Sequence, residues 1–251
     1  MKFKNIFRSF QLLSLFLLVT SEVDYCNIFC PIGKHIACGN NGDFGKSCTS
    51  DAKIVELTQE NIETILNEHN RLRNRIASGV EVRFKTAARM TSMIWNKQLA
   101  LFAELNARTC LFQHDECRNT EKFKYVGQNI AMTQANLDYP DLTVFLNNSI
   151  NDWYGELKDA SQSDIDSYQQ TEKIIGHMTQ LVNDRANEFG CAVVQFSDSE
   201  WKTSILVCDY SLTNMIGEKV YESGEIASKC TTGVNNKFEA LCSENEVVDN
   251  L

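Results

Sequence analysis

The pattern of apolar and polar positions predicts three amphipathic helices in this chain, over residues 58–79, 96–109 and 141–158. The hydroxyl of Thr58 is suited to capping the first turn of the first helix, and Gly79 to ending its last turn. Positions at three- and four-residue spacing mark the face that each helix is expected to bury. These positions are Ile62, Ile65, Leu66, His69, Leu72 and Ile76 in the first helix, Leu99, Phe102 and Ala103 in the second, and Phe145, Ile150, Trp153 and Leu157 in the third.

Three further runs have the β-branched and alternating character of strands: residues 128–133, 191–196 and 203–210. The last two flank a polar stretch at 197–200 and are expected to form a hairpin. Helices and strands mix without regular strand–helix–strand crossovers. We therefore predict an α+β fold, an α-β-α sandwich built on an antiparallel sheet.

The first 21 residues have the pattern of a secretory signal peptide, with Lys2, Lys4 and Arg8 ahead of an apolar run at positions 12–19. This run is too short to cross a bilayer, so we expect cleavage after Ser21. No second run approaches spanning length. The mature chain is therefore expected to be soluble and extracellular, with no membrane span.

The charge balance is acidic, with 24 basic and 33 acidic residues and a net charge of −9. Removing residues 1–21 takes three of the 24 cations and none of the 33 acids, which moves the net charge to −12. An acidic surface repels phosphate backbones, so nucleic acid is excluded as a partner. Nothing in the pattern calls for an oligomer, and we expect a monomer.

The chain contains ten cysteines, an even number that in a secreted protein predicts a disulfide framework. Four of them lie among glycines and asparagines between Cys26 and Cys48, where no helical or alternating period is present. We therefore expect residues 22–55 to be a cysteine-rich extension held by cross-links, residues 56–225 to be the main domain, and residues 226–251 to be a polar tail with its own disulfide. Spacing alone does not choose among the many pairings.

Several short motifs, taken in order, resemble the CAP superfamily of cysteine-rich secretory proteins, antigen 5 and pathogenesis-related proteins, and within it the antigen 5 proteins of flies. The resemblance covers nearly the whole mature chain. Its motifs are Asp24-Tyr25-Cys26, Glu68-His69-Asn70-x-x-Arg73, the run from Cys110 to Cys117, Val126-Gly127-Gln128-Asn129, Trp153-Tyr154-Gly155-Glu156, Gly176-His177-Met178-Thr179-Gln180 and Cys208-Asp209-Tyr210.

The resemblance to antigen 5 implies a specific set of disulfides. They are Cys26–Cys38, Cys30–Cys117, Cys48–Cys110 and Cys191–Cys208, which leaves Cys230 and Cys242 to pair with each other. These bridges would fasten the N-terminal extension to the second helix and the loop that follows it. Each would stabilise the fold by roughly 2–4 kcal/mol by restricting the unfolded chain.

The resemblance also implies a cleft lined by a tetrad, here His114, Gln128, Glu156 and His177. Gln128 departs from the glutamate usual in the superfamily, and a neutral amide is neither a general base nor a strong metal ligand. The remaining His114, His177 and Glu156 form a known zinc ligand set that leaves a position for water. The alternative is a polar cleft whose groups hydrogen-bond one another and hold no metal.

Three functions remain open at this point. The first is a non-enzymatic binding protein of saliva or venom, an allergen, that holds a small lipid or sterol-type ligand or a protein of a host or tissue. Phe145 and Trp153 could then contact the ligand, or they could simply belong to the core. The second is a metal-dependent hydrolase or protease that uses the cleft histidines. The third is a rigid disulfide-braced interaction protein.

No cofactor is required by the binding and interaction hypotheses, and a divalent metal such as zinc is the one that the cleft suggests. The cysteines are committed to bridges, which removes thiolate nucleophiles. Asn147 begins an Asn-x-Ser glycosylation sequence, but it falls inside the third predicted helix, where the transferase needs an extended loop. His69 lies on the buried stripe of the first helix, where a structural role is expected.

Overall fold

The computed structural model describes residues 23–249, so the predicted signal peptide lies outside the described residues. Within that range no helix has both the length and the apolar character needed to cross a membrane. The elements in chain order are β1 (Lys53–Val55), α1 (Gln59–Ala77), β2 (Ile94–Trp95), α2 (Lys97–Ala107), β3 (Gly127–Ala135), α3 (Leu142–Gly155), the 3₁₀ turn η1 (Glu156–Lys158), α4 (Gln162–Asp166), α5 (Gly176–Leu181), β4 (Glu188–Asp198) and β5 (Trp201–Tyr210).

The three predicted helices are confirmed, and each starts where a polar side chain satisfies its first backbone N–H groups. Thr58 and Asn61 form a reciprocal capping box at the start of α1. Asn96 accepts from the backbone N–H groups of Gln98 and Leu99 in α2, and Asp141 caps α3 through the N–H of Val144. Local sequence therefore set these helix starts.

The sheet has the strand order β1-β4-β5-β3, and every neighbouring pair in this order is antiparallel. The short β2 pairs in parallel with the start of β4. The hairpin predicted between 191 and 210 is confirmed, with Cys191 directly opposite Cys208. The observed strands are longer than predicted because the sheet ladder continues through polar residues at the strand ends.

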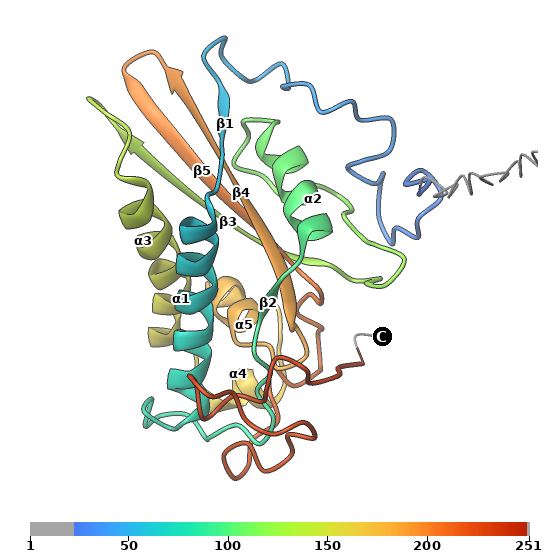
Figure 1. The fold of residues 1–251 in the computed structure, drawn as a ribbon, viewed down its shortest axis with the longest axis vertical. Helices are drawn as coiled ribbons and strands as arrows, with labels where there is room; N and C mark the ends of the chain where they lie inside the picture. The colour runs from blue at the N-terminus through green and yellow to red at the C-terminus, as the bar shows by residue number, and fades with distance from the viewer. Residues whose placement is uncertain (1–22, 250–251) are drawn as a thin grey trace, which may run out of the picture.

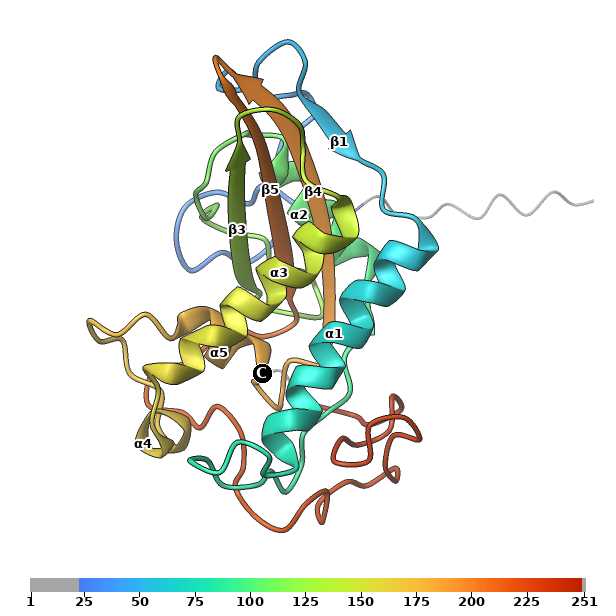
Figure 2. The same ribbon diagram turned by 90° about the vertical axis from the view of Figure 1, so that its left-hand side faces the viewer.

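Helices cover both faces of this sheet, which confirms the predicted α-β-α sandwich (Figures 1 and 2). One core lies between the sheet and the layer of α1, α3 and α5, and a smaller one lies between the sheet and α2. Gly190 on β4 allows α2 to sit close, because a Cβ there would lie 2.2 Å from the backbone nitrogen of Ala100. The glycine before Cys191 is thus a packing requirement.

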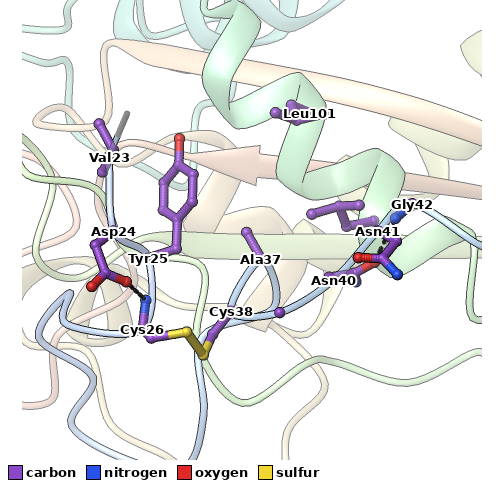
Figure 3. Close-up of a pocket in the computed structure, with 12 residues that line it drawn as sticks. Val23, Asp24, Tyr25, Cys26, Ala37, Cys38, Asn40, Asn41, Gly42 and Leu101 are labelled. Atoms are coloured by element: carbon purple, nitrogen blue, oxygen red, sulfur yellow. Dashed lines mark hydrogen bonds between the residues drawn. A yellow bond between two sulfur atoms is a disulfide. The ribbon is translucent and has the colours of Figure 1, made fainter. Parts of the chain in front are cut away.

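The five disulfides join the pairs that the resemblance implies: Cys26–Cys38, Cys30–Cys117, Cys48–Cys110, Cys191–Cys208 and Cys230–Cys242. Two of them fasten the N-terminal extension to the end of α2 and to the loop after it. Figure 3 shows the first bridge beside a cavity of about 550 Å³ that the extension forms with Leu101 and Leu105 of α2. This cavity lies on the α2 face of the sheet.

The C-terminal segment packs against the body of the protein beneath α1 (Figure 2). Leu241 is fully buried, and the backbone N–H of Cys242 donates to the carbonyl of Met90. The buried Glu246 pairs with Arg89 at 2.8 Å and accepts from Thr231 and Thr232, and these bonds hold its pKa at about 2 despite its burial. The tail is therefore tied to the main domain by specific contacts.

Replacing Cys230 and Cys242 together by alanine is expected to lower the free energy of unfolding by about 2 kcal/mol, because the unfolded chain regains the freedom of a 12-residue loop. Urea denaturation at neutral pH measures the change. The matched control is the Cys26/Cys38 double variant, whose loop has the same sequence separation of 12. An unchanged unfolding midpoint for the 230/242 variant would contradict a structural role for this bridge.

Candidate functional site

The residues of the predicted tetrad come together at one end of the sheet. His114, Gln128 and His177 line a cavity of about 350 Å³, and Glu156 is hydrogen-bonded to His177. They come from four different elements: the loop after α2, strand β3, the turn η1 and helix α5. Folding thus assembles a cleft from residues up to 63 positions apart, since His114 and His177 are numbered 63 apart.

Glu156 is committed to holding His177. Its Oε1 accepts from His177 Nδ1 at 2.6 Å, and its Oε2 accepts from the backbone N–H groups of His177 and Met178 at 2.9 and 3.0 Å. The ring of Trp153 stacks against His177 with centroids 6.2 Å apart and an interplanar angle of 17°. Glu156 and Trp153 therefore fix the orientation of the His177 imidazole, and Nε2 remains as its other ring nitrogen.

His114 is paired with the residue that departs from the superfamily pattern. Its Nδ1 lies 2.7 Å from Oε1 of Gln128. The Nε2 amide group of Gln128 donates to Asp115 at 2.9 Å and to Asp209 at 2.8 Å. Burial lowers the pKa of His114, and the neighbouring charges of Arg118 and His177 lower it further, while the bond to Gln128 opposes them.

Sequence reasoning missed Asp115, Arg118 and Asp209 as parts of this site. Arg118 Nε contacts both oxygens of Asp115, at 2.9 and 3.0 Å, and Arg118 also donates to the carbonyl of Val126. Asp209 is fully buried. The sequence places Asp115 directly after His114 and Asp209 within the Cys208-Asp209-Tyr210 motif. Only the fold, however, shows which side chains these two acids contact.

A second network supports the backbone of His177. Asn129 donates to the carbonyl of His177 at 3.1 Å. The hydroxyl of Tyr210 lies within 3.4 Å of the same Asn129 amide and 2.9 Å from Nε2 of His69. His69 also contacts the carbonyl of Ile65 at 2.8 Å and is fully buried. His69 therefore has the structural role expected from its place on the first helix.

Gly127 packs closely against Gln180, one of the residues that line the cleft. A Cβ at this position would lie 2.2 Å from the side-chain oxygen of Gln180. Gln180 donates to the carbonyl of Leu212, and Asn214 donates to that of Gly176. The remaining walls are mostly polar and come from the loop before α5: Tyr168, Gln169, Gln170, Thr171, Lys173 and Ile174.

The zinc ligand set considered from the sequence does not match this geometry. It requires Glu156 as the third ligand, and both oxygens of that carboxylate already accept hydrogen bonds. Among residues 23–249 no group of three or more histidine, cysteine, aspartate or glutamate side chains is arranged to hold a metal ion. No catalytic step through a three-ligand zinc ion is therefore supported by these residues.

The residues considered as ligand contacts on α3 belong to the core. Phe145 and Trp153 are 4% and 3% exposed, and Trp153 Nε1 lies 3.4 Å from the carbonyl oxygen of Ile130. Of the two alternatives that the sequence left open for these residues, their burial matches the core: the apolar stripe of α3 packs in the main core. Asn147 lies within α3, in regular helical conformation.

A separate, mainly apolar groove of about 380 Å³ lies between β1, the start of α1 and α2. Its apolar lining includes Ile54, Leu57, Ile62, Trp95 and Leu101. Leu101 is 47% exposed, so the groove opens to the surface. It is distinct from the histidine cleft in both position and chemistry.

Comparison with known proteins identifies a family pattern. The sequence pattern described as CAP, the cysteine-rich secretory protein family, matches residues 66–210. The chain is 40% identical over 238 residues to Venom allergen-1 of Aedes aegypti, with 92% of each chain covered. It is 32% identical to Tabinhibitin 3 of Tabanus yao, with 98% of this chain and 97% of the relative covered.

Solved structures agree with the sequence comparison. The crystal structure titled NaASP2 with Zn2+ is similar with a TM-score of 0.61 and 26% identity, and the match covers 78% of this chain and all of that one. The sandwich described above is therefore a fold that these proteins share.

Proposed function

The chain belongs to the cysteine-rich secretory protein family, and from that premise we propose that it is a secreted, non-enzymatic binding protein of the antigen 5 type. In this proposal the cleft of His114 and His177 is a recognition site. The relatives named venom allergens support a place among venom or salivary components and a role as an allergen.

The observation that carries the proposal is the commitment of the acidic and amide groups in the cleft. The metal-dependent hydrolase considered from the sequence needs a metal-activated water and a carboxylate that is free to hold the metal or to act as base. Here Glu156 is fully engaged with α5, and Gln128 is a neutral amide that donates to Asp115 and Asp209. Glu156 and Gln128 therefore serve to orient the two imidazoles.

The polar lining of the cleft favours a polar group of an extracellular protein over a lipid tail. Amide, hydroxyl and imidazole groups dominate the wall, and burying them against hydrocarbon would leave them without hydrogen-bond partners. A surface loop of a host or tissue protein supplies such partners. The Cys30–Cys117 bridge restrains the loop that carries His114, and the Cys191–Cys208 bridge lies beside Asp209. These restraints preorganise part of the cleft, which reduces the entropy lost on binding.

This proposal predicts that the double variant His114→Ala/His177→Ala binds its protein partner at least tenfold more weakly, a loss of about 1.4 kcal/mol or more, as for residues that contribute strongly to an interface. Purified extracellular proteins of candidate hosts or tissues are screened by surface plasmon resonance. Val82→Ala, at a side chain that is 92% exposed, is the control. Wild-type turnover of peptide, ester or phosphodiester substrates that the double variant loses would overturn the proposal.

A small hydrophobic ligand is the second candidate, and the apolar groove of α2 is the observation that favours it. Trp95 lines this groove, so its fluorescence should change when a fatty acid or sterol enters. We expect Leu101→Glu to abolish the change because a carboxylate would then occupy the groove, and the exposed Val82→Glu variant to retain it. An equal change of Trp95 fluorescence in both variants would show that the ligand does not bind in this groove.

A divalent ion held by the two imidazoles is the third candidate. The related structure with Zn2+ motivates the test, while residues 23–249 hold no group of three or more histidine, cysteine, aspartate or glutamate side chains arranged for a metal ion. Calorimetric titration of metal-free protein with zinc, repeated on His114→Ala and His177→Ala, is the measurement. Zinc binding that both variants retain would show that the ion does not bind in the cleft.

A further inference from the structure

The side-chain amide of Gln128 is held from three directions. Its Nε2 donates to Oδ2 of Asp115 at 2.9 Å and to Oδ1 of Asp209 at 2.8 Å, and its Oε1 lies 2.7 Å from Nδ1 of His114. Carboxylate oxygens at these distances accept from an amide NH₂ group and would repel an amide oxygen. The two acids therefore decide which end of the Gln128 amide faces His114.

This orientation determines the tautomer of His114. An amide oxygen is an acceptor only, so the Nδ1 atom of His114 must carry the proton that is shared with Gln128. In the neutral ring Nε2 then has a free lone pair. The bond from His177 Nδ1 to the Glu156 carboxylate has the same consequence for the second ring.

The two acids on Gln128 differ in their environments. Asp115 accepts from Arg118 Nε and from the side chain of Asn106 at 3.0 Å, a donor set that suits an ionised carboxylate. Asp209 is fully buried and receives only the Gln128 bond, on Oδ1. Two carboxylates thus share one amide NH₂ group beside a single guanidinium that contacts Asp115.

Unpaired acceptors point to a proton on Asp209. Its Oδ2 is buried without a hydrogen-bond partner, and so is Oδ1 of Asn106, which belongs to the same network through Asp115. A buried carboxylate that lacks hydrogen bonds on one oxygen is strongly disfavoured. Protonation of Asp209 removes the charge and makes Oδ2 a hydroxyl donor in place of an unpaired acceptor. Consistently, burial raises the pKa of Asp209 well above its usual value; Asp115 adds to this, while the charge of Arg118 and the bond from Gln128 oppose it.

We propose that Asp209, as a neutral carboxylic acid, and Asp115, as an anion, are positioning residues that orient Gln128 and thereby hold His114 as the Nδ1–H tautomer with Nε2 as the acceptor for a bound group. The proposal rests on the proposed function in taking the cleft as the binding site. It also accounts for the departure from glutamate. A carboxylate at 128 would face two other acids without an N–H group to bridge them.

The test is histidine tautomer assignment by ¹⁵N–¹H NMR on the full oxidised protein at pH 7.5, without any partner present. The wild-type protein is expected to show His114 protonated at Nδ1 and unprotonated at Nε2. Asp209→Asn should preserve this pattern and the thermal midpoint, because asparagine supplies the same acceptor and donor as a carboxylic acid. Gln128→Leu should abolish the Nδ1–H pattern because the acceptor is gone.

Each contrary outcome is decisive. His114 protonated at Nε2 in the wild-type protein would overturn the tautomer assignment, and so would an unchanged pattern in Gln128→Leu. A lower midpoint or an altered tautomer in Asp209→Asn would show that Asp209 acts as a charge. Since no partner is used, failure of partner binding in the double histidine variant leaves this readout unaffected, and the two proposals fail separately.

Discussion

Replacing Arg73 by methionine is expected to lower the free energy of unfolding by about 4 kcal/mol, because the buried acceptors around it would lose the donors that the guanidinium supplies. The Arg73 side chain is fully buried on α1. It donates to the carbonyls of Thr91, Leu181 and Asn183 at 2.8–3.0 Å and to the hydroxyl of Thr91 at 2.9 Å. Burial lowers the pKa of Arg73 to about 10, which still leaves the guanidinium charged at neutral pH.

The matched control is Arg71→Met on the same helix. Arg71 is half exposed and pairs with Glu68 over one turn of α1, so its loss should cost less than about 1 kcal/mol. Urea unfolding of both variants at pH 7.5 gives the comparison. Similar midpoints for the two variants would show that the buried carbonyls find other donors and that Arg73 is not a structural anchor.

Arg73 also connects the helix layer to the cleft. The carbonyl of Leu181 is at the end of α5, the helix that begins beside His177. We therefore expect Arg73→Met to broaden the NMR signals of His177 even at temperatures where the variant remains folded. The spacing in Glu68-His69-Asn70-x-x-Arg73 thus has a physical account. One face of α1 supplies buried hydrogen bonds to Tyr210 in β5, to the segment that contains Thr91 and Met93, and to the end of α5.

Lowering the pH from 7.5 to 4.5 is expected to remove about 2.5 kcal/mol of stability through His69 alone. Burial lowers the pKa of His69 to about 4 in the folded protein, against about 6.5 in the unfolded chain. Between these values the unfolded chain binds more protons. The contribution of the neutral ring is therefore complete above pH 6.5 and is lost as the pH falls toward 4.

The measurement is the free energy of urea unfolding of the wild type and of His69→Gln, each at pH 7.5 and pH 4.5. The change with pH in the variant is subtracted from the change in the wild type, which gives a double difference. Asp184, whose pKa burial raises to about 6, changes stability with pH in the opposite direction, and it is present in both proteins. Its effect therefore cancels in the double difference. Equal pH dependence in the wild type and the variant would mean that the His69 ring accepts a proton without leaving its bonds to Ile65 and Tyr210.

The long helices and the central hairpin could be predicted from sequence because local interactions define them. Thr58, Asn96 and Asp141 each satisfy backbone groups two or three residues away, and the apolar stripes of α1 and α3 are buried as their spacing predicts. The short elements could not be predicted. The two residues of β2 and the six of α5 carry no period of their own and form because the sheet and Glu156 satisfy their backbone.

For the site, the sequence by itself provided the two histidines, Gln128 and Glu156 through a resemblance of motifs. Only the tertiary structure decided what these groups do. In the folded protein Glu156, a candidate metal ligand by sequence, accepts a hydrogen bond from His177, and Phe145 lies in the core. The pairing of β3 with β5 places Asp209 directly opposite Gln128. A side chain's chemistry depends on its partners and its exposure to water, and residues far apart in the chain supply both.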